Sequence, residues 1–296
     1  MRVKFERVGF LGSGRMGSAL SLAMFNAGYE IEMIASRSLA AASSLASQIV
    51  GCKATDNFAD LQERCDLIFL TVPDHAITGI VSDFQWRKGQ AVIHCSGVLG
   101  TEVLENARVL GAYVGAVHPL QTFCGNMCDS EHLLGSTFTV SSDAGLHDWI
   151  IRLVETLKGK IVSISAEDKP LYHASAVMVC GYLTTLLEGA IQMWAAMGFD
   201  SNEAIDALFP LIQSTLRNIE MDGLERSVTG PIPREDFDTI RLHLGAIRKR
   251  TPQLLPLYST LGLAMVDLVS RLSGTEDQHR AMWHDVLVGK MGSDSA

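Results

Sequence analysis

The stretch RVGFLGSGRMGSALSLAMFNAGYEIEMIASRS, residues 7–38, decides the fold of this chain. It opens with an apolar run at residues 8–11, which is typical of a buried parallel strand. The alanine- and leucine-rich residues 15–27 predict a helix, and Gly28 stands where a helix commonly ends. Residues 29–35 then predict a second strand. A strand, a glycine-rich turn, a helix and a strand in this order predict a β-α-β unit that binds a dinucleotide.

Three glycines between the first strand and the helix follow the spacing G-x-G-x-x-G. Gly12 permits the tight turn, Gly14 lets the backbone approach a pyrophosphate, and Gly17 lets the helix pack closely on the strand. The free N–H groups at the start of the helix then favour an anion. The residues expected to bind the cofactor here are Gly12, Ser13, Gly14, Arg15, Met16 and Gly17. The alternative is a fold of the same kind that has lost its cofactor.

The end of the second strand selects the cofactor. In a protein that binds NAD, an acidic residue about 20 positions beyond the glycines binds the ribose 2′-hydroxyl. This chain has Ser36, Arg37 and Ser38 there. A guanidinium and two hydroxyls suit a 2′-phosphate, which a carboxylate would repel. We therefore expect NADP(H), with a solvated loop arginine as the alternative interpretation of Arg37.

Composition and charge limit the class of protein. A chain of 296 residues suggests about two domains, and 47% hydrophobic residues are enough for sizeable cores. The net charge of −9 argues against nucleic acid or an anionic membrane as a partner. The longest uncharged stretch, residues 174–187, is too short to span a bilayer. We expect a small-molecule substrate, with no nucleic-acid and no membrane partner.

The first residues and the cysteines indicate a cytoplasmic protein. Charged residues precede the first predicted strand, so we expect no signal peptide. The 6 cysteines show no paired C-x-x-C spacing and no histidine partners at the spacing of a zinc site. We therefore expect free thiols in a reducing compartment, and no metal site.

A change in character divides the chain. In the first part, apolar runs that predict strands alternate with patterns that predict helices, and the second part is helical to its end. The predicted fold is α/β: a Rossmann-type doubly wound sheet over residues 1–165, followed by an all-helical C-terminal domain over residues 166–296. The second domain is expected to begin with helices at residues 167–197 and 201–222, the latter kinked at Pro210.

Polar residues follow several predicted strands at their carboxyl ends, where ligands bind in open α/β sheets. Ser96 follows the strand at residues 91–95, and His118 follows the strand at residues 112–117. Histidine is suited to proton transfer near neutral pH, and a serine hydroxyl can donate to the same atom. Both are therefore catalytic candidates. As alternatives, Ser96 is a turn residue and His118 fixes the turn at Pro119.

Further residues are expected to bind the ligands. The strand over residues 67–73 ends in Thr71, Val72 and Pro73, which are expected to contact the cofactor. Gln121, in the long loop after His118, is a candidate for substrate binding. Arg234 lies in the sequence GPIPRED just before a helix. Backbone made rigid by prolines beside an arginine suits the binding of an anion. As the alternative, this segment only stabilises the domain.

The start of the helical part carries two more catalytic candidates. Lys169 and His173 are four residues apart, so they share a helix face, with Tyr172 beside them. If this helix starts next to the sheet edge, its first turns would face the nicotinamide. A lysine or histidine there would protonate the product or hold a substrate carboxylate. The alternatives are a solvated charge for Lys169 and a packing role for His173.

The stretch at residues 174–187 is apolar almost all round, as in a helix that is buried on every side. The helical part of the chain is small for enclosing such a helix alone. We therefore expect a homodimer formed through the helical domain.

These landmarks together resemble a two-domain family that pairs a Rossmann-like domain with a helical domain of unknown function, DUF2520. The segments that carry the resemblance are GFLGSGRMG, CDLIFLTVPD, HCSG, AVHPLQTF, KPLYHASAV and GPIPRED. The resemblance covers nearly the whole chain and implies an oxidoreductase whose substrate is unassigned. The layout is also similar to that of prephenate dehydrogenases, pyrroline-5-carboxylate reductases and β-hydroxyacid dehydrogenases.

Two of these similar families suggest roles for particular residues. In prephenate dehydrogenases, a serine after one strand and the histidine of an HP motif after the next form the catalytic pair, which matches Ser96 and His118. Those enzymes continue with a small residue and glycine where this chain has LQT, which argues against prephenate as the substrate. The similarity to β-hydroxyacid dehydrogenases implies a catalytic role for Lys169, although His173 replaces their asparagine.

Two hypotheses from different classes follow. The favoured one is an NADP(H)-dependent oxidoreductase that transfers a hydride to or from a small carbonyl, imine or hydroxy acid. The second is a non-catalytic NADP(H)-binding sensor or scaffold, which needs the glycine loop and Arg37 but has no use for Ser96, His118 and Lys169 at the nicotinamide. Within the enzymes, a ketopantoate-reductase-like activity is a further alternative by analogy of fold.

If Arg37 pairs with the 2′-phosphate, the protein should bind NADPH more tightly than NADH. A charge-assisted contact of this kind contributes about 1.5–3 kcal/mol. Arg37→Ala should therefore lose about ten- to hundred-fold in NADPH affinity and little in NADH affinity. Fluorescence titration with both cofactors measures the two effects. Equal affinity for the two cofactors in the unmutated protein would contradict the assignment.

Overall fold

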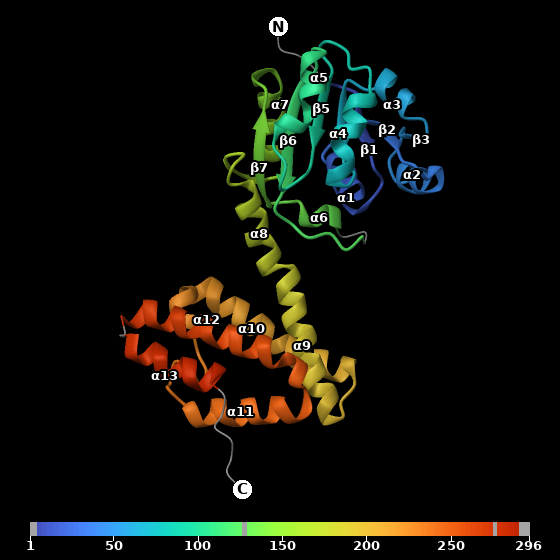
Figure 1. The fold of residues 1–296 in the computed structure, drawn as a ribbon. Coiled ribbons are helices and arrows are strands. Elements are labelled where there is room, and N and C mark those ends of the chain that lie inside the picture. The colour runs from blue at the N-terminus through green and yellow to red at the C-terminus, as the bar shows by residue number, and fades with distance from the viewer. Residues whose placement is uncertain (1–4, 126–128, 275–276, 290–296) are drawn as a thin grey trace. The chain divides into compact units, whose positions relative to one another are not determined.

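The computed structural model describes residues 5–125, 129–274 and 277–289 (Figure 1). The chain divides into two compact units, Met1–Cys180 and Gly181–Ala296. Every strand that the structure describes lies in the first unit, and the described part of the second unit is helical.

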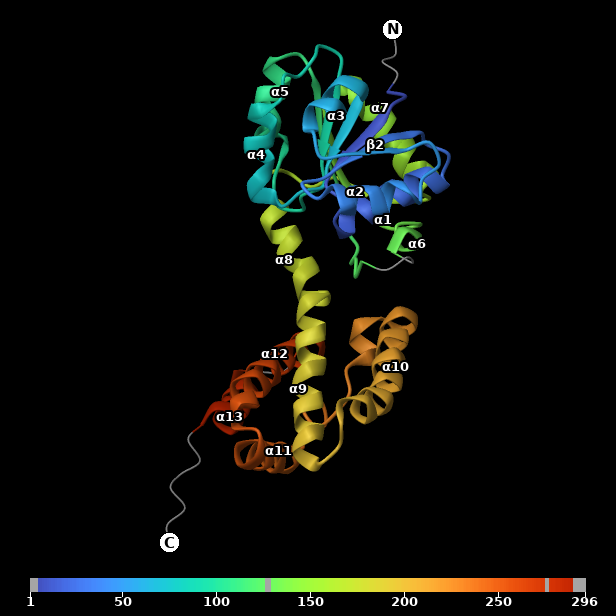
Figure 2. The same cartoon turned by 90° about the vertical axis from the view of Figure 1, so that its right-hand side faces the viewer.

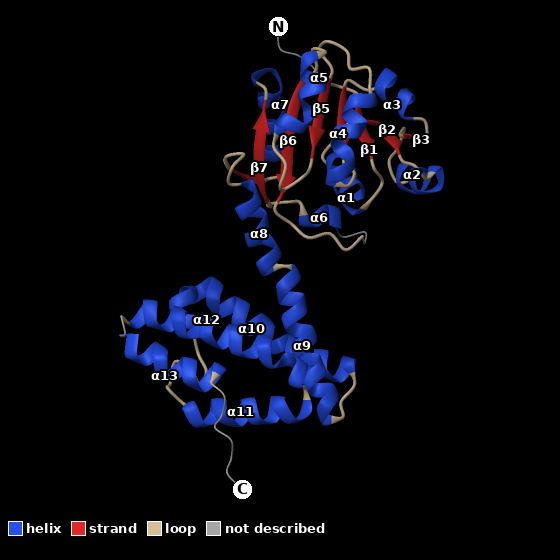
Figure 3. Ribbon diagram, viewed as in Figure 1, coloured by secondary structure: helices blue, strands red, loops and turns tan. Residues whose placement is uncertain are grey.

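An eight-stranded sheet forms the centre of the first unit (Figure 3). Its strands are β1 (Val8–Leu11), β2 (Ile31–Ala35), β3 (Lys53–Thr55), β4 (Leu67–Leu70), β5 (Ala91–His94), β6 (Tyr113–Pro119), β7 (Thr137–Ser142) and β8 (Lys160–Val162). Their order is β3-β2-β1-β4-β5-β6-β7-β8, and the pairs are parallel except for β6 with β7. The chain reverses its winding between β1 and β4, so the predicted Rossmann-type doubly wound sheet is confirmed.

Helices cover both faces of this sheet (Figure 2). The helices packed on one face are α1 (Arg15–Asn26), α2 (Leu39–Ala46) and α7 (Ala144–Thr156). Those on the other face are α3 (Phe58–Arg64), α4 (Asp74–Asp83) and, after a 3₁₀ turn at Thr101–Leu104, α5 (Glu105–Val109). On the α1 face, the buried rings of Phe10 and Phe69 stack with centroids 5.0 Å apart. The central strands are thus buried on both sides, which explains their continuous apolar runs.

Two further helices of the first unit bear on the site. The short α6 (Asp129–His132) lies in the loop after β6 and packs near α1. The sequence pattern grouped α8 (Lys169–Val179) with the second domain, but by its contacts this helix belongs to the first unit.

The second unit consists of helices around a small apolar core. They are α9 (Gly181–Met197), α10 (Ser201–Ser227), α11 (Phe237–Arg250), α12 (Leu255–Ser273), which follows a 3₁₀ turn at Pro252–Leu254, and α13 (Asp277–Val288). Phe237 stacks on the buried Trp283 with ring centroids 4.2 Å apart, which joins α11 to α13. Asp200 and Glu203 form a capping box at the start of α10. The predicted helical character of this region is confirmed.

Two helix boundaries differ from the prediction. The single helix expected over residues 167–197 is divided at Cys180, the C-cap of α8, where φ is −110° and ψ is −75°. The helix expected to end at residue 222 runs to Ser227, with non-helical backbone at Gly223, where φ is +79°. Pro210 lies inside α10 with helical residues on both sides. The departure from helical geometry in α10 is therefore at the glycine, which alone tolerates this φ without strain.

The expectation that residues 174–187 are buried on every side is wrong for the single chain. Large apolar side chains of α8 and α9 are exposed, and the most apolar 18-residue window of Lys169–Met197 is only 6% buried. This stretch and Pro252–Leu272 are long and apolar enough to cross a membrane, judged by length and composition only. The sequence pattern identified residues 174–187 as apolar correctly. The rest of the single chain does not bury these side chains.

Candidate active site

The glycine loop between β1 and α1 is built by close backbone contacts. Gly12 has φ +117°, and a Cβ at this position would collide with the carbonyl oxygen of Thr71. A Cβ at Gly17 would collide with the carbonyl oxygen of Gly12. The Thr71 hydroxyl donates to that same oxygen at 2.9 Å. A Cβ at Gly14 would meet nothing within 4 Å, so the loop is tight on its inner side and open on its outer side.

The start of α1 has the properties of an anion site. The helix is 12 residues long, its N-cap is Gly14, and its first turn holds no acidic residue and no side-chain cap. Its first N–H groups are therefore left for a ligand, and the helix dipole favours negative charge there. Arg15 is exposed in this turn, and its Cγ lies 3.5 Å from the Cβ position of Gly125 in the loop after β6. These residues fit the pyrophosphate of a dinucleotide.

The predicted 2′-phosphate site lies at the end of β2. Ser36 donates its backbone N–H to Thr55 at 3.1 Å, and Ser38 caps α2 by accepting from the N–H of Ala41 at 3.2 Å. Both serines thus have structural roles. Arg37 between them is exposed, and no described carboxylate pairs with its guanidinium. Contact of Ser36, Arg37 and Ser38 with a 2′-phosphate stays a prediction.

Strand register brings the catalytic candidates to one edge of the sheet. Leu70 of β4 pairs with His94 of β5, which pairs with Ala116 of β6. His94 is fully buried, with its Nε2 2.9 Å from the Gly100 carbonyl oxygen and its Nδ1 accepting from the Ser96 N–H at 3.2 Å. Burial lowers the pKa of His94 to about 4. His94 therefore shapes the turn after β5.

Ser96 has a defined set of partners. Its hydroxyl donates to the carboxylate of Asp74 at 2.6 Å and accepts from the backbone N–H groups of Val98 and Leu99 at 3.2 and 3.1 Å. Asp74 is the first residue of α4. The serine therefore holds the turn after β5 to the start of α4. Its role toward a substrate stays a prediction, and any ligand must compete with Asp74 for its proton.

His118 lies at the centre of a cluster of rings. Its Nδ1 is 2.9 Å from the Tyr172 hydroxyl, and the His173 ring lies with its centroid 6.1 Å away. A Cβ at Gly97 would lie within 3 Å of both histidine rings, so only glycine fits between them. Burial lowers the pKa of His118 to about 4, and the nearby charges of His173 and Lys169 act in the same direction.

Lys169 is buried, with only 3% of its surface exposed. The solvated charge that was the alternative for this residue is therefore wrong. Burial lowers the pKa of its ammonium, and the nearby carboxylates of Glu102 and Asp74 act against this effect. Lys169 and His173 lie on the same helix, α8, as expected, and both act electrostatically on His118.

The two predicted substrate residues lie in different surroundings. The Gln121 amide donates to the His132 carbonyl oxygen at 3.0 Å, so it braces the loop after β6. Arg234 is exposed in the turn before α11 of the second unit. Their contact with a substrate stays a prediction. The structure adds Asp74, Tyr172 and Gly97, to which the sequence analysis gave no role.

Two family models match this chain, and each covers part of the candidate site. The model of the Rossmann-like domain matches residues 1–119, which include the glycine loop and His118. The model of the domain of unknown function DUF2520 matches residues 136–265, which include Lys169 and Tyr172. The chain pairs a Rossmann-like domain with a DUF2520 domain. The resemblance found in the sequence is thereby confirmed, and the ring cluster joins residues from both matches.

Solved structures share the fold of this Rossmann-like and DUF2520 pair. A proposed NADP oxidoreductase of Bacteroides fragilis is 21% identical, with a TM-score of 0.74 over 90% of this chain and 99% of that one. A Thermotoga maritima protein is 23% identical, with a TM-score of 0.68 over 90% and 98%. The reductive aminase of Aspergillus terreus, solved with NADPH and ethyl levulinate, is 16% identical, with a TM-score of 0.63 over 92% and 94%. No curated protein matches the chain.

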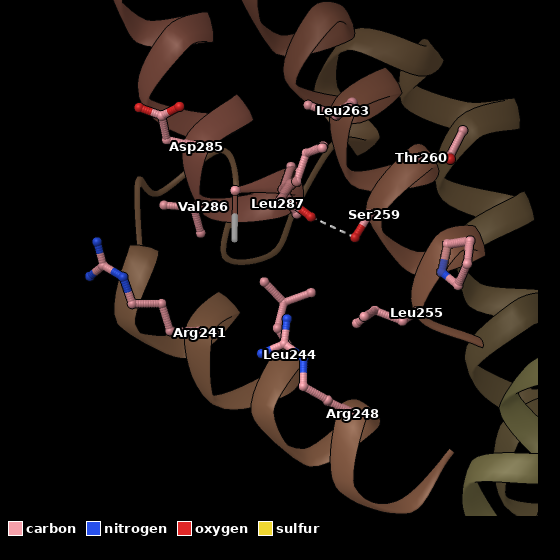
Figure 4. Close-up of a pocket in the computed structure, with 13 residues that line it drawn as sticks. Arg241, Leu244, Arg248, Leu255, Ser259, Thr260, Leu263, Asp285, Val286 and Leu287 are labelled. Carbon is pink, nitrogen blue, oxygen red and sulfur yellow. Dashed lines mark hydrogen bonds between the residues drawn. The ribbon is translucent and has the colours of Figure 1, made fainter. Parts of the chain in front are cut away.

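The DUF2520 match also extends into the second unit, where α11 and α12 line a cavity of about 470 Å³ together with α13 (Figure 4). Its polar lining includes Arg241, Arg248 and Asp285, and its apolar lining includes Leu244 and Leu263. None of the catalytic candidates lines this cavity. The site at the sheet edge is therefore supported by chemistry and fold topology rather than by the size of a cavity.

The low pKa of His118 predicts an acid-sensitive protein. The ordinary value is 6.5 and the folded value about 4, so between these pH values the unfolded chain binds a proton that the folded chain does not. The free energy of unfolding should therefore fall as the pH is lowered from 6.5 to 4, and His94 should act in the same direction. In His118→Asn, the slope of this free energy against pH should decrease by up to about 1.4 kcal/mol per pH unit. Urea unfolding at a series of pH values measures it, and an identical slope in the two proteins would contradict it.

Proposed function

We propose that this protein is an NADP(H)-dependent oxidoreductase that transfers a hydride to or from a small carbonyl, imine or hydroxy acid. The observation that carries the proposal is the cluster of His118, His173 and Lys169 at the strand ends of a sheet that also holds an open glycine loop. In open α/β sheets, ligands bind at this edge. The solved structures of similar fold include proteins described as NADP oxidoreductases and reductases, which adds support.

Particular residues fit the cofactor. The N–H groups at the start of α1 would hold the pyrophosphate beside Gly14, and Arg37 would pair with a 2′-phosphate. When bound, the nicotinamide supplies the hydride. The protein's part is then to orient the substrate, and to hold or move a proton at the substrate oxygen or nitrogen.

The charges around His118 favour a substrate that carries a carboxylate. Lys169 is a buried cation at the edge of the cluster, and the His173 ring lies on the same helix beside it. A carboxylate held by Lys169 would offset the cost of burying the ammonium. It would also raise the pKa of His118 from about 4 toward neutrality, where proton transfer is most effective. Small 2-oxo and imino acids fit this description.

Turnover of mutants tests the proposal. Once NADPH oxidation is found with one of a panel of 2-oxo and imino acids, His118→Asn should lower kcat by about 10²–10⁴-fold and leave NADPH binding unchanged. Ser96→Ala should cost less, because one neutral hydrogen bond contributes about 0.5–1.5 kcal/mol. The double mutant should lose less than the sum of the two if both residues serve one substrate atom.

NADPH titration and melting temperature are measured on the same variants as a control. The alternative in which His118 only fixes the turn at Pro119 expects a lower melting temperature with an unchanged kcat. NADPH binding without oxidation of any panel member would favour the non-catalytic sensor. An unchanged kcat in His118→Asn would end the catalytic assignment.

We propose further that the protein works in the cytoplasm as a homodimer formed through α8 and α9. The exposed apolar residues on these helices include Leu171, Met178, Val179, Tyr182, Leu183 and Leu186. Exposed apolar side chains in such number commonly mark an interface, and a second copy of the same helices supplies matching side chains. The described cysteines are free thiols, which suits a reducing compartment.

Light scattering without detergent should show a dimer at micromolar concentration. Replacement of Leu183 and Leu186 by Asp should convert it to a monomer, because two charges would have to be buried in the interface. Val109→Asp, at an exposed apolar position on α5, serves as the matched control and should leave the dimer intact. A monomeric unmutated protein, or one that floats with anionic vesicles, would contradict the proposal.

A further inference from the structure

Tyr172 on α8 meets the catalytic candidate His118 directly, although the function proposed above gives it no role. Its hydroxyl is 2.9 Å from Nδ1 of His118, and the two rings are perpendicular with centroids 5.6 Å apart. The other ring nitrogen, Nε2, points toward Gly97, where a Cβ would lie only 2.8 Å away. The hydrogen bond described for the His118 ring is made by Nδ1 and not by Nε2. One nitrogen of His118 is therefore held by the protein, and the other is left for a ligand.

Thr139 adds a third member to this chain of polar groups. It lies opposite His118 in the antiparallel pairing of β6 with β7, so the two side chains share one face of the sheet. Thr139 is only 2% exposed, and in the described part of the chain its hydroxyl oxygen has no partner at hydrogen-bond geometry. The same hydroxyl is a neighbour of the Tyr172 phenol. A small rotation of either group would join them.

Two arrangements pass the hydrogen bonds in one direction along these three residues. In the first, Thr139 donates to the Tyr172 oxygen and Tyr172 donates to Nδ1 of His118, so both hydroxyl protons have an acceptor within the protein. In the second, Nδ1–H donates to Tyr172 and Tyr172 donates to Thr139, which leaves the Thr139 proton without an acceptor. Because an unsatisfied buried donor costs free energy, the first arrangement is favoured. The better acceptor of the pair, the imidazole nitrogen, then also faces the better donor, the phenol.

We propose that Tyr172 is a positioning residue that donates to Nδ1 of His118 and so holds the neutral imidazole with its proton on Nε2. In a neutral histidine, the hydrogen bond made by one nitrogen decides which nitrogen carries the proton. His118 then presents an Nε2–H donor beside Gly97, where it would stabilise negative charge on the substrate oxygen or nitrogen. This last role rests on the proposed function, whereas the proton position does not.

The surroundings of His118 keep its imidazole neutral. Its hydrogen bonding therefore depends on which ring nitrogen carries the single proton. Burial, His173, Lys169 and His94 lower its pKa, and Asp74 raises it. Burial also raises the pKa of the Tyr172 phenol, so this group keeps its proton. Near neutral pH both partners are therefore uncharged.

Nitrogen NMR of the full-length protein with labelled histidine measures the proton position without any cofactor or substrate. At pH 7.5, His118 should show a protonated Nε2 and an unprotonated, hydrogen-bonded Nδ1, and His118→Asn assigns its signals. In Tyr172→Phe, the preference for the Nε2–H tautomer should fall about ten-fold, since one neutral hydrogen bond is lost. Thr139→Val should shift the Nδ1 signal in the same direction by less.

The chain offers a matched control. His243 and Tyr258 in the second unit form a second pair, with Nδ1 and the hydroxyl 2.7 Å apart. Tyr258→Phe should change the signals of His243 and leave those of His118 unchanged. A proton on Nδ1 of His118 in the unmutated protein would overturn the proposal, even if Tyr172→Phe fails to fold. So would an unchanged tautomer ratio in a folded Tyr172→Phe.

Kinetics separate this proposal from the proposed function. If the panel yields a substrate, Tyr172→Phe should lower kcat about ten-fold with little change in KM for NADPH, and a purely structural role would change only the melting temperature. If NADPH does not bind, the proposed function fails while the NMR result still decides the position of the proton. If NADPH is oxidised but His118 carries its proton on Nδ1, only the role of Tyr172 fails.

Discussion

The parallel register of β4, β5 and β6 is the constraint on which the candidate site depends. Leu70, His94 and Ala116 are paired across these strands; β4 and β5 end at this level, and β6 continues to Pro119. Ser96 lies just beyond His94, and His118 lies just beyond Ala116 within β6, so both reach the same edge of the sheet. Ser96 therefore contacts the start of α4, and His118 lies beside the turn after β5. Ladder hydrogen bonds, rather than contacts among the polar residues themselves, fix this arrangement. The buried apolar strands thereby hold polar groups together that would otherwise be separated by solvent.

Local signals in the sequence were sufficient for the fold of the first unit. The spacing of Gly12, Gly14 and Gly17 is decided by contacts within a single β-α turn and by its neighbour Thr71, so it can be read without knowledge of distant parts of the chain. The interruption at Cys180 gave no decisive signal, because the single Gly181 that follows it is tolerated inside an otherwise helical pattern and need not end a helix. The exposure of α8 and α9 was likewise invisible, since a hydrophobic pattern reports what should be buried but not what covers it.

The candidate site was predictable as residue types but not as partnerships. His118, Lys169 and His173 were found because strand ends and helix spacing place them. The contact of His118 with Tyr172 joins residues 54 positions apart, and no pattern within one segment can indicate it. The bond from Ser96 to Asp74, 22 positions apart, was missed for the same reason. These partnerships decide which protons are available, so chemistry was less predictable than architecture.

Burial gives the site a consistent electrostatic character. It lowers the pKa of both His118 and Lys169, which disfavours their charged forms before any ligand is present. His118 is therefore a neutral hydrogen-bonding group in the free protein and not an imidazolium. An anionic group of a substrate would reverse part of this cost at Lys169 and make protonation of His118 easier at the same time. In the proposed function, substrate charge would thus be part of the acid–base machinery, and a neutral ketone or imine of the same shape would leave His118 with its Nε2–H alone.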